Sequence, residues 1–137
     1  CAAALETAGG IMVTGHNSPL MHAGSAVVLN ALKALAGIPK SIMLISPSVI
    51  DAITRMKRDV LRGRGVSLNI DEILSCLAMS STTNEAAEKA MKCLPDLAEA
   101  EVHFTHIPSA GDTIGLRKLG INVTSEPRFP SKNIYNP

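Results

Sequence analysis

Apolar and polar positions along the chain predict short strands that alternate with helices. A glycine pair at 9–10 separates two apolar segments, which predicts a hairpin, or a turn followed by a strand at 11–13. The run 42–45 is continuously apolar and bounded by turn residues, a pattern typical of a buried parallel strand. Two further strands are predicted at 102–105 and 121–124.

Capping residues mark where the helices begin and end. Ser18 and Ser46 are each followed by a proline, and a serine N-cap before a proline is a favoured helix start. Gly37 and Gly120 are typical of helix ends. A polar loop is predicted at 62–65. The predicted helices cover 20–36, about 48–61, from Asn69 or Asp71 to about 79, 85–93 after an Asn84 cap, and 113–119.

This alternation predicts an α/β domain, layered α/β/α, with a mixed or mainly parallel sheet. A chain of 137 residues is long enough for one compact core. We therefore expect a single α/β domain over 1–126 and an irregular tail, rich in Pro and Asn, over 127–137.

Composition argues against several classes of function. Aromatic residues make up 2% of the chain and Trp is absent, so there is almost no platform for stacking bases. A net charge of +1 gives no field that would steer the chain to nucleic acid or to a membrane, and the apolar runs are too short to span one. The three cysteines lack paired spacing, which is typical of reduced thiols. We expect a cytoplasmic protein with no nucleic-acid partner and no membrane partner.

Two polar turns precede predicted helices and are candidate ligand sites. A helix start leaves backbone N–H groups unpaired and carries partial positive charge, so it can hold a phosphate or a carboxylate. Each turn also has a plain structural interpretation, as an N-cap. The candidate ligand-binding residues are Thr14, His16, Asn17 and Ser18 in the first turn, and Ser81, Thr82, Thr83 and Asn84, which follow Ser80, in the second.

Charged residues leave further alternatives open. Arg117 could clamp an anionic ligand, or could simply be a cation favoured near a helix C-terminus. Basic residues gather over 55–64 and acidic ones over 85–101. These groups are either solvated faces or complementary contacts between domains or subunits.

Sequence motifs of the familiar metal and nucleotide enzymes are missing. There is no H-x-E with P-C-x-x-C of zinc deaminases, no H-E-x-x-H of zinc proteases and no phosphate loop. His103 and His106 are three residues apart, which on a strand places them on opposite faces, so we predict no metal site. Ser18 and His22 lie one helical turn apart, but no G-x-S-x-G elbow exposes the serine. Cys1 could be an N-terminal nucleophile or the edge of a trimmed chain.

An ordered set of short stretches resembles the C-terminal region of a large bacterial family, the domain of unknown function eighteen forty-six. The resemblance covers nearly the whole chain. The stretches are 13–15 with Ser18, 29–33 and 36–38, 44–47, 81–84, 101–103, 117–121, Thr124 and 126–127.

The resemblance implies one domain of a protein three to four times longer, with a Rossmann-like N-terminal part. It implies a topology similar to the cytidine-deaminase-like fold, which a purine-biosynthetic transformylase also has, here without the zinc motif. Some relatives are labelled ATP-dependent peptidases. The chain departs from the family at His16, where relatives have lysine, and over 105–115.

Two hypotheses follow. The chain binds a small anionic ligand, phosphate-like or nucleotide-like, at helix N-termini. Alternatively, it is a structural or oligomerisation module without activity of its own, which packs against the missing N-terminal region of the same protein or against a second copy. The sequence assigns no cofactor and no catalytic residue, and leaves open whether the chain is an enzyme.

Overall fold

The computed structural model describes residues 1–63 and 65–129. Arg64 of the predicted polar loop and residues 130–137 of the predicted tail lie outside the described residues. The helices of the described part are α1 (Ala23–Ala36), α2 (Pro47–Arg55), α3 (Ile70–Ser81), α4 (Glu85–Lys92) and α5 (Ala110–Lys118), with a π-helical turn η1 (Met56–Val60) and a 3-10 helix η2 (Leu94–Leu97).

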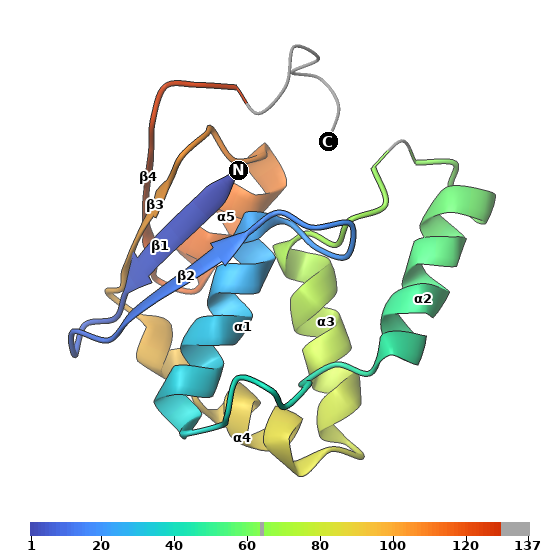
Figure 1. The fold of residues 1–137 in the computed structure, drawn as a ribbon, viewed down its shortest axis with the longest axis horizontal. Helices are drawn as coiled ribbons and strands as arrows, with labels where there is room; N and C mark the ends of the chain where they lie inside the picture. The colour runs from blue at the N-terminus through green and yellow to red at the C-terminus, as the bar shows by residue number, and fades with distance from the viewer. Residues whose placement is uncertain (64, 130–137) are drawn as a thin grey trace.

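Four strands form one mixed sheet in the order β2-β1-β3-β4 (Figure 1). β1 (Ala2–Glu6) is antiparallel to both of its neighbours, β2 (Met12–His16) and β3 (Glu101–Phe104). β3 and β4 (Asn122–Ser125) are parallel. The hairpin and the α/β class with a mixed sheet are therefore confirmed. The carboxyl ends of β2, β3 and β4 meet at one edge of the sheet, because β1 reverses the direction on both sides.

Local capping explains most helix boundaries. The Oγ of Ser46 accepts from the Val49 amide at the start of α2, as its sequence position predicted. Asn69 forms a capping box with Glu72 at the start of α3. Gly37 ends α1 with a φ of 69°, the left-handed conformation that glycine adopts without a steric penalty.

The start of α1 was predicted wrongly. The helix begins at Ala23 rather than just after Ser18. Ser18 Oγ accepts from the amides of Leu20 and Met21, which closes a tight turn instead of a helix. Met21 then bridges to Leu68 in parallel fashion, and this pairing holds the segment extended until the helix starts.

The predicted strand at 42–45 is also wrong. This segment is a loop between α1 and α2. Leu44 and Ile45 are buried in the core, whereas Ile42 and Met43 are exposed. The apolar run therefore packs into the core without joining the sheet. A short apolar run alone does not distinguish a buried strand from a buried segment of another kind.

The helix predicted at 113–119 starts earlier, at Ala110. Ser109 is its N-cap and accepts from the Asp112 amide. Residues 109–112 are rich in turn-forming residues, which are also the residues that cap helices, so the local sequence does not distinguish a turn from this helix start.

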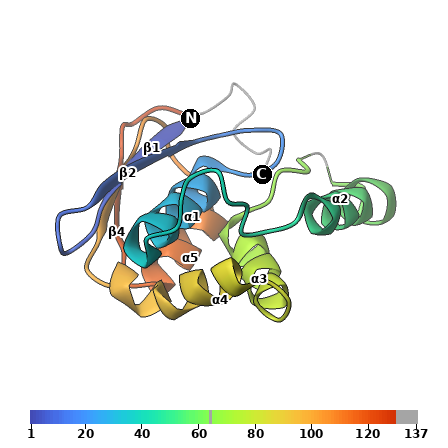
Figure 2. The same ribbon diagram turned by 60° about the horizontal axis from the view of Figure 1, so that its bottom comes forward.

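The helices gather on one side of the sheet, as Figure 2 shows. Along β1 and β3, alternate side chains such as Leu5, Val102 and Phe104 are buried against them. The other face of these strands is exposed and bears Glu101 and His103. The core is almost wholly aliphatic, in keeping with an aromatic content of 2%, and Phe104 is its largest buried side chain.

Candidate ligand-binding pocket

Hydrogen bonds within the chain occupy the side chains of Asn17 and Ser18 in the first polar turn, whereas Thr14 and His16 lie in β2. Asn17 Oδ1 accepts from the Ala23 amide at 2.7 Å and thereby supplies the cap that α1 otherwise lacks. Ser18 Oγ is taken by the two local amides described above. The Thr14 carbonyl accepts from Asn30 Nδ2 on α1 at 2.8 Å, and His16 is exposed. These contacts show local structural roles for the turn.

A partly buried acid–imidazole pair, Asp112 with His22, lies beside this turn. Asp112 is buried, and its Oδ2 lies 2.7 Å from Nδ1 of His22, while its Oδ1 accepts from the Ile70 amide at 3.0 Å. The Asp112 carboxylate, in the first turn of α5, therefore joins the N-cap residue of α1 to the first residue of α3. No hydrogen bond joins Ser18 to His22 in the described part of the chain, so this arrangement forms no serine–histidine–aspartate triad.

The polar side chains of the second turn have two structural roles, one at the end of α3 and one at the start of α4. Ser81 Oγ donates to the Ala78 carbonyl at 2.6 Å, and Thr82 Oγ1 donates to the Met79 carbonyl at 2.7 Å. These hydroxyls satisfy the last carbonyls of α3. Asn84 Oδ1 accepts from two amides of α4, which confirms Asn84 as an N-cap, and its Nδ2 donates to the Met43 carbonyl.

An open pocket of about 550 Å³ lies beside this second turn. The end of α3 and the N-termini of α2 and α4 surround it. Figure 1 shows the end of α3 and the start of α4 at the bottom of the view, with the start of α2 above them on the right. Its lining is Ser46, Val49, Met79, Ser80, Thr83, Asn84, Glu85 and Ala86.

Ser80 is the unusual member of this lining. The residue is 8% exposed, and its Oγ is the one buried side-chain polar atom of the described residues without a hydrogen-bond partner. Buried hydroxyls nearly always have such a partner, because leaving one unpaired is unfavourable. The sequence carried a signal for it: Ile73, Cys76, Leu77 and Ser80 share one helical stripe, and the other three are core residues.

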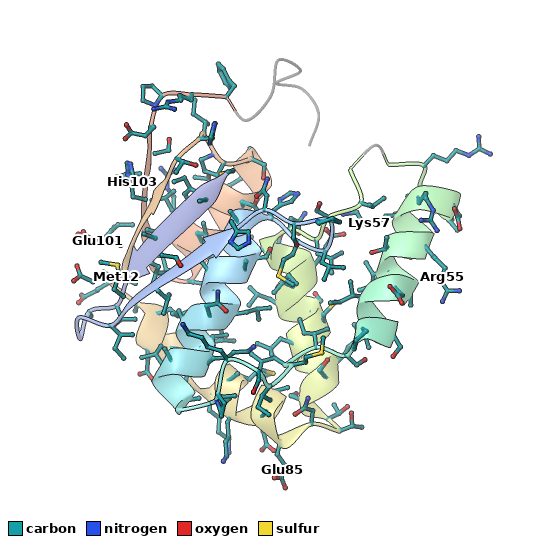
Figure 3. The ribbon with its side chains drawn as sticks, viewed as in Figure 1. Met12, Arg55, Lys57, Glu85, Glu101 and His103 are labelled. Atoms are coloured by element: carbon teal, nitrogen blue, oxygen red, sulfur yellow. The ribbon has the colours of Figure 1, made fainter. Side chains whose placement is uncertain are left out.

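The electrostatics of the pocket come from helix ends. The caps Ser46 and Asn84 place the N-termini of α2 and α4 in its wall, each with about half a positive charge. No lysine or arginine is in the lining. Glu85 brings a carboxylate, but its side chain points away from the fold (Figure 3).

The structure does not bring the two turns together. Ser67, just before α3, donates to the Ser18 carbonyl, whereas the second turn follows the end of α3. The 12 residues of α3 separate them by about 18 Å, at 1.5 Å per residue. Arg117 is exposed in the last turn of α5, and no ion pair in the described residues joins it to either turn.

The thiols of Cys76 and Cys93 are poor nucleophiles in this fold. Burial raises the pKa of the Cys76 thiol, and the Glu72 carboxylate raises it further. Burial likewise raises the pKa of Cys93, with a contribution from Asp96. Both thiols therefore keep their protons at a higher pH than an ordinary cysteine does. This behaviour fits a packing role better than a catalytic one.

Metal ligands and membrane spans are not found in the described residues. No three His, Cys, Asp or Glu side chains among them converge as metal ligands do. His103 instead contacts Thr124 and Glu126 on the exposed face of the sheet, at 2.8 Å each. None of the described helices has the length and apolar character needed to cross a membrane.

Comparison with known proteins identifies the family. The family model described as "Domain of unknown function DUF1846, C-terminal" matches residues 1–135. The chain belongs to this family. The resemblance inferred from the sequence is therefore confirmed.

Curated relatives in the family are named UPF0371 proteins. One from Clostridium botulinum (strain Alaska E43 / Type E3) is 41% identical over 132 residues, which cover 96% of this chain and 26% of the relative. One from Fusobacterium nucleatum is 41% identical over 134 residues, covering 98% and 26%. One from Corynebacterium glutamicum (strain R) is 41% identical over 132 residues, covering 96% and 27%. The chain thus spans about a quarter of the length of the relatives it matches, and a larger N-terminal part exists in the full proteins.

Proposed function

We propose that this chain binds a small anionic ligand, bearing a phosphate or a carboxylate, in the pocket at the ends of α2, α3 and α4. The observation that carries the proposal is the unpaired buried hydroxyl of Ser80 in the pocket lining. A ligand oxygen that accepted from this hydroxyl would remove the cost of leaving it unpaired.

The charge of the ligand follows from the helix ends. Two N-termini favour negative charge at the wall that carries Ser46 and Asn84. Two of the opposing carbonyls at the end of α3, those of Ala78 and Met79, already accept from the hydroxyls of Ser81 and Thr82. Because no cationic side chain lines the pocket, we expect dissociation constants of about 1 mM for simple anions.

The shape of the pocket favours a metabolite over a bare ion. Val49, Met79 and Ala86 form an apolar part of the lining, next to the hydroxyl groups of Ser80 and Thr83. An anionic group at the helix ends would leave the carbon part of the ligand against these side chains. The volume of about 550 Å³ is in the range of small-molecule sites.

The proposed site retains only part of the candidate set from the sequence. Thr83 and Asn84 belong to it, and Ser46 and Ser80 join them. The hydroxyls of Ser81 and Thr82 support the end of α3. The first turn and Arg117 form no part of this pocket.

Nuclear magnetic resonance of the isotope-labelled chain tests the proposal. Inorganic phosphate and adenosine monophosphate are titrated at constant ionic strength. We expect saturable amide shifts confined to Ser80, Thr83, Glu85 and their neighbours, with half-saturation at about 1 mM.

Two serine variants complete this test. Ser80→Ala should weaken binding about tenfold, by loss of one hydrogen bond to a charged group. Ser81→Ala is the matched control, because its hydroxyl donates to a helix carbonyl instead. Absent shifts, shifts spread evenly over the surface, or equal binding by Ser80→Ala would contradict the proposal.

A further inference from the structure

Residues 47–61 form an arm on the rim of the molecule, consisting of α2, η1 and Leu61. Figures 1 and 2 show its helix beside α3, on the side away from the sheet. Only Ile50 of the arm is fully buried, while Val49 and Ile53 pack partly against the core. The base of the arm is therefore anchored, and its far end extends beyond the core.

The far end of the arm carries exposed apolar side chains. Val60 is 72% exposed and Leu61 is 65% exposed, the two highest values among the large apolar side chains of the described residues. Met56, about one turn earlier, is also exposed. Adjacent exposed apolar side chains of this kind are typical of contact surfaces between proteins or domains. We call Met56, Val60 and Leu61 the arm tip.

Three exposed arginines, Arg55, Arg58 and Arg62, are close in sequence to the arm tip and outnumber the exposed acids of the arm, Asp51 and Asp59. Arg55 points into solvent at the outer side of the arm (Figure 3). Arg58 is exposed and bonds only its sequence neighbour Asp59 among the described residues, and Arg62 is exposed beyond the helix. An apolar centre with a basic rim fits a partner surface with an apolar centre and an acidic rim.

Lys57 fixes the arm tip in place. Its Nζ donates to the Ser67 carbonyl and to Glu72 Oε1, both at 2.9 Å. Glu72 also completes the capping box of α3, so the clamp joins the arm to a helix start that is itself held. The side chain of Lys57 lies on the side of the arm that faces α3 (Figure 3). A surface held in this way loses little conformational freedom when it is covered.

We propose that the arm tip docks on the N-terminal part of the family protein, on a surface with an apolar centre and an acidic rim. The matched region is the C-terminal domain and covers about a quarter of the relatives, so roughly three quarters of their length lies outside it. Both surfaces then belong to one polypeptide, which gives them a high effective concentration. An internal contact is favoured over a free partner for this reason.

Thiol labelling of the full-length family protein tests this contact. Leu61→Cys is compared with Ile114→Cys, a control at an apolar position of α5 that is 54% exposed. Iodoacetamide labelling is read peptide by peptide with mass spectrometry. We expect Leu61→Cys to react about tenfold more slowly than the control in the native protein, and at the same rate after unfolding.

A second variant tests the chemistry of the partner surface. Arg62→Glu, added to Leu61→Cys, should raise its labelling rate toward that of the control, because a reversed charge would face acidic groups. Equal native rates for Leu61→Cys and Ile114→Cys would overturn the proposal. Protection that vanishes on dilution would also overturn it, since that result identifies a second copy as the occupant. If adding Arg62→Glu leaves the labelling rate of Leu61→Cys unchanged, the partner surface does not have the proposed acidic rim.

Discussion

Removing the hydroxyl of Ser80 should stabilise the chain. Ser80 is buried and its Oγ has no partner, a state that costs about 1–3 kcal/mol for a buried polar group. Alanine keeps the Cβ and also has a higher helix propensity, worth about 0.5 kcal/mol. Allowing for the small void left by one oxygen, we expect Ser80→Ala to raise the free energy of unfolding by about 1 kcal/mol.

Urea unfolding in a buffer without phosphate measures this effect. With a slope of about 2 kcal/mol per M, the midpoint should rise by about 0.5 M at unchanged slope. Ser25→Ala is the matched control, because Ser25 is equally helical and buried but donates to the Leu68 carbonyl at 3.0 Å. That variant should lose about 1 kcal/mol. If Ser80→Ala loses as much as Ser25→Ala, the Ser80 hydroxyl is already paired and the reasoning behind the pocket fails.

Four other outcomes follow from the structure. Gly15→Ala should cost about 3 kcal/mol or more, because the new Cβ would lie 2.5 Å from the backbone nitrogen of Val27; circular dichroism on heating measures the loss. Asn84→Ala should lower the urea midpoint by an amount equal to about 1 kcal/mol, since it removes the cap of α4. Residues 1–126 are proposed as one folding unit, so fluorescence from an introduced Trp and circular dichroism should report a single coincident urea transition. Burial raises the pKa of Cys76 above 9.0, so the folded chain binds the thiol proton more tightly than the unfolded chain does. The contribution of this group to the free energy of unfolding is therefore complete below about pH 8 and falls as the pH rises through 9 and above. Cys76→Ala should reduce this decline of the free energy of unfolding with pH.

Local signals predicted those elements whose boundaries local contacts set. Ser46 with Pro47, Asn84 and Gly37 act through hydrogen bonds or backbone angles within a few residues. The same signal failed at Ser18, because the segment after it pairs with Leu68, which is far away in the sequence. Pairing with a distant residue prevents the helix from starting at Ser18, and a short stretch of sequence contains no sign of that pairing.

The candidate site was predictable to a similar extent. Polar turns at helix starts pointed to Thr83 and Asn84, which line the pocket. The contribution of Ser46 depends on where α2 lies, which no local pattern reveals. The pairing of His22 with Asp112 joins residues 90 positions apart, so it too depends on the tertiary structure. Ser80 differs from these, because a serine on the apolar stripe of a helix is visible in the sequence and marks a buried polar group.

The two proposals meet in α2. Its N-terminus supplies Ser46 and Val49 to the pocket, and its other end leads into the arm tip. A helix moves as a nearly rigid rod, so a contact that shifts the arm tip would also shift one wall of the pocket. Thermodynamic linkage then requires the effect to be reciprocal: a ligand that binds more tightly to the docked arm must strengthen docking by the same factor. Suppose that docking tightens the binding of adenosine monophosphate by a certain factor. In the full-length protein, adenosine monophosphate should then slow the labelling of Leu61→Cys by that same factor. If labelling is slow but insensitive to a ligand that binds, α2 supports both surfaces without coupling them.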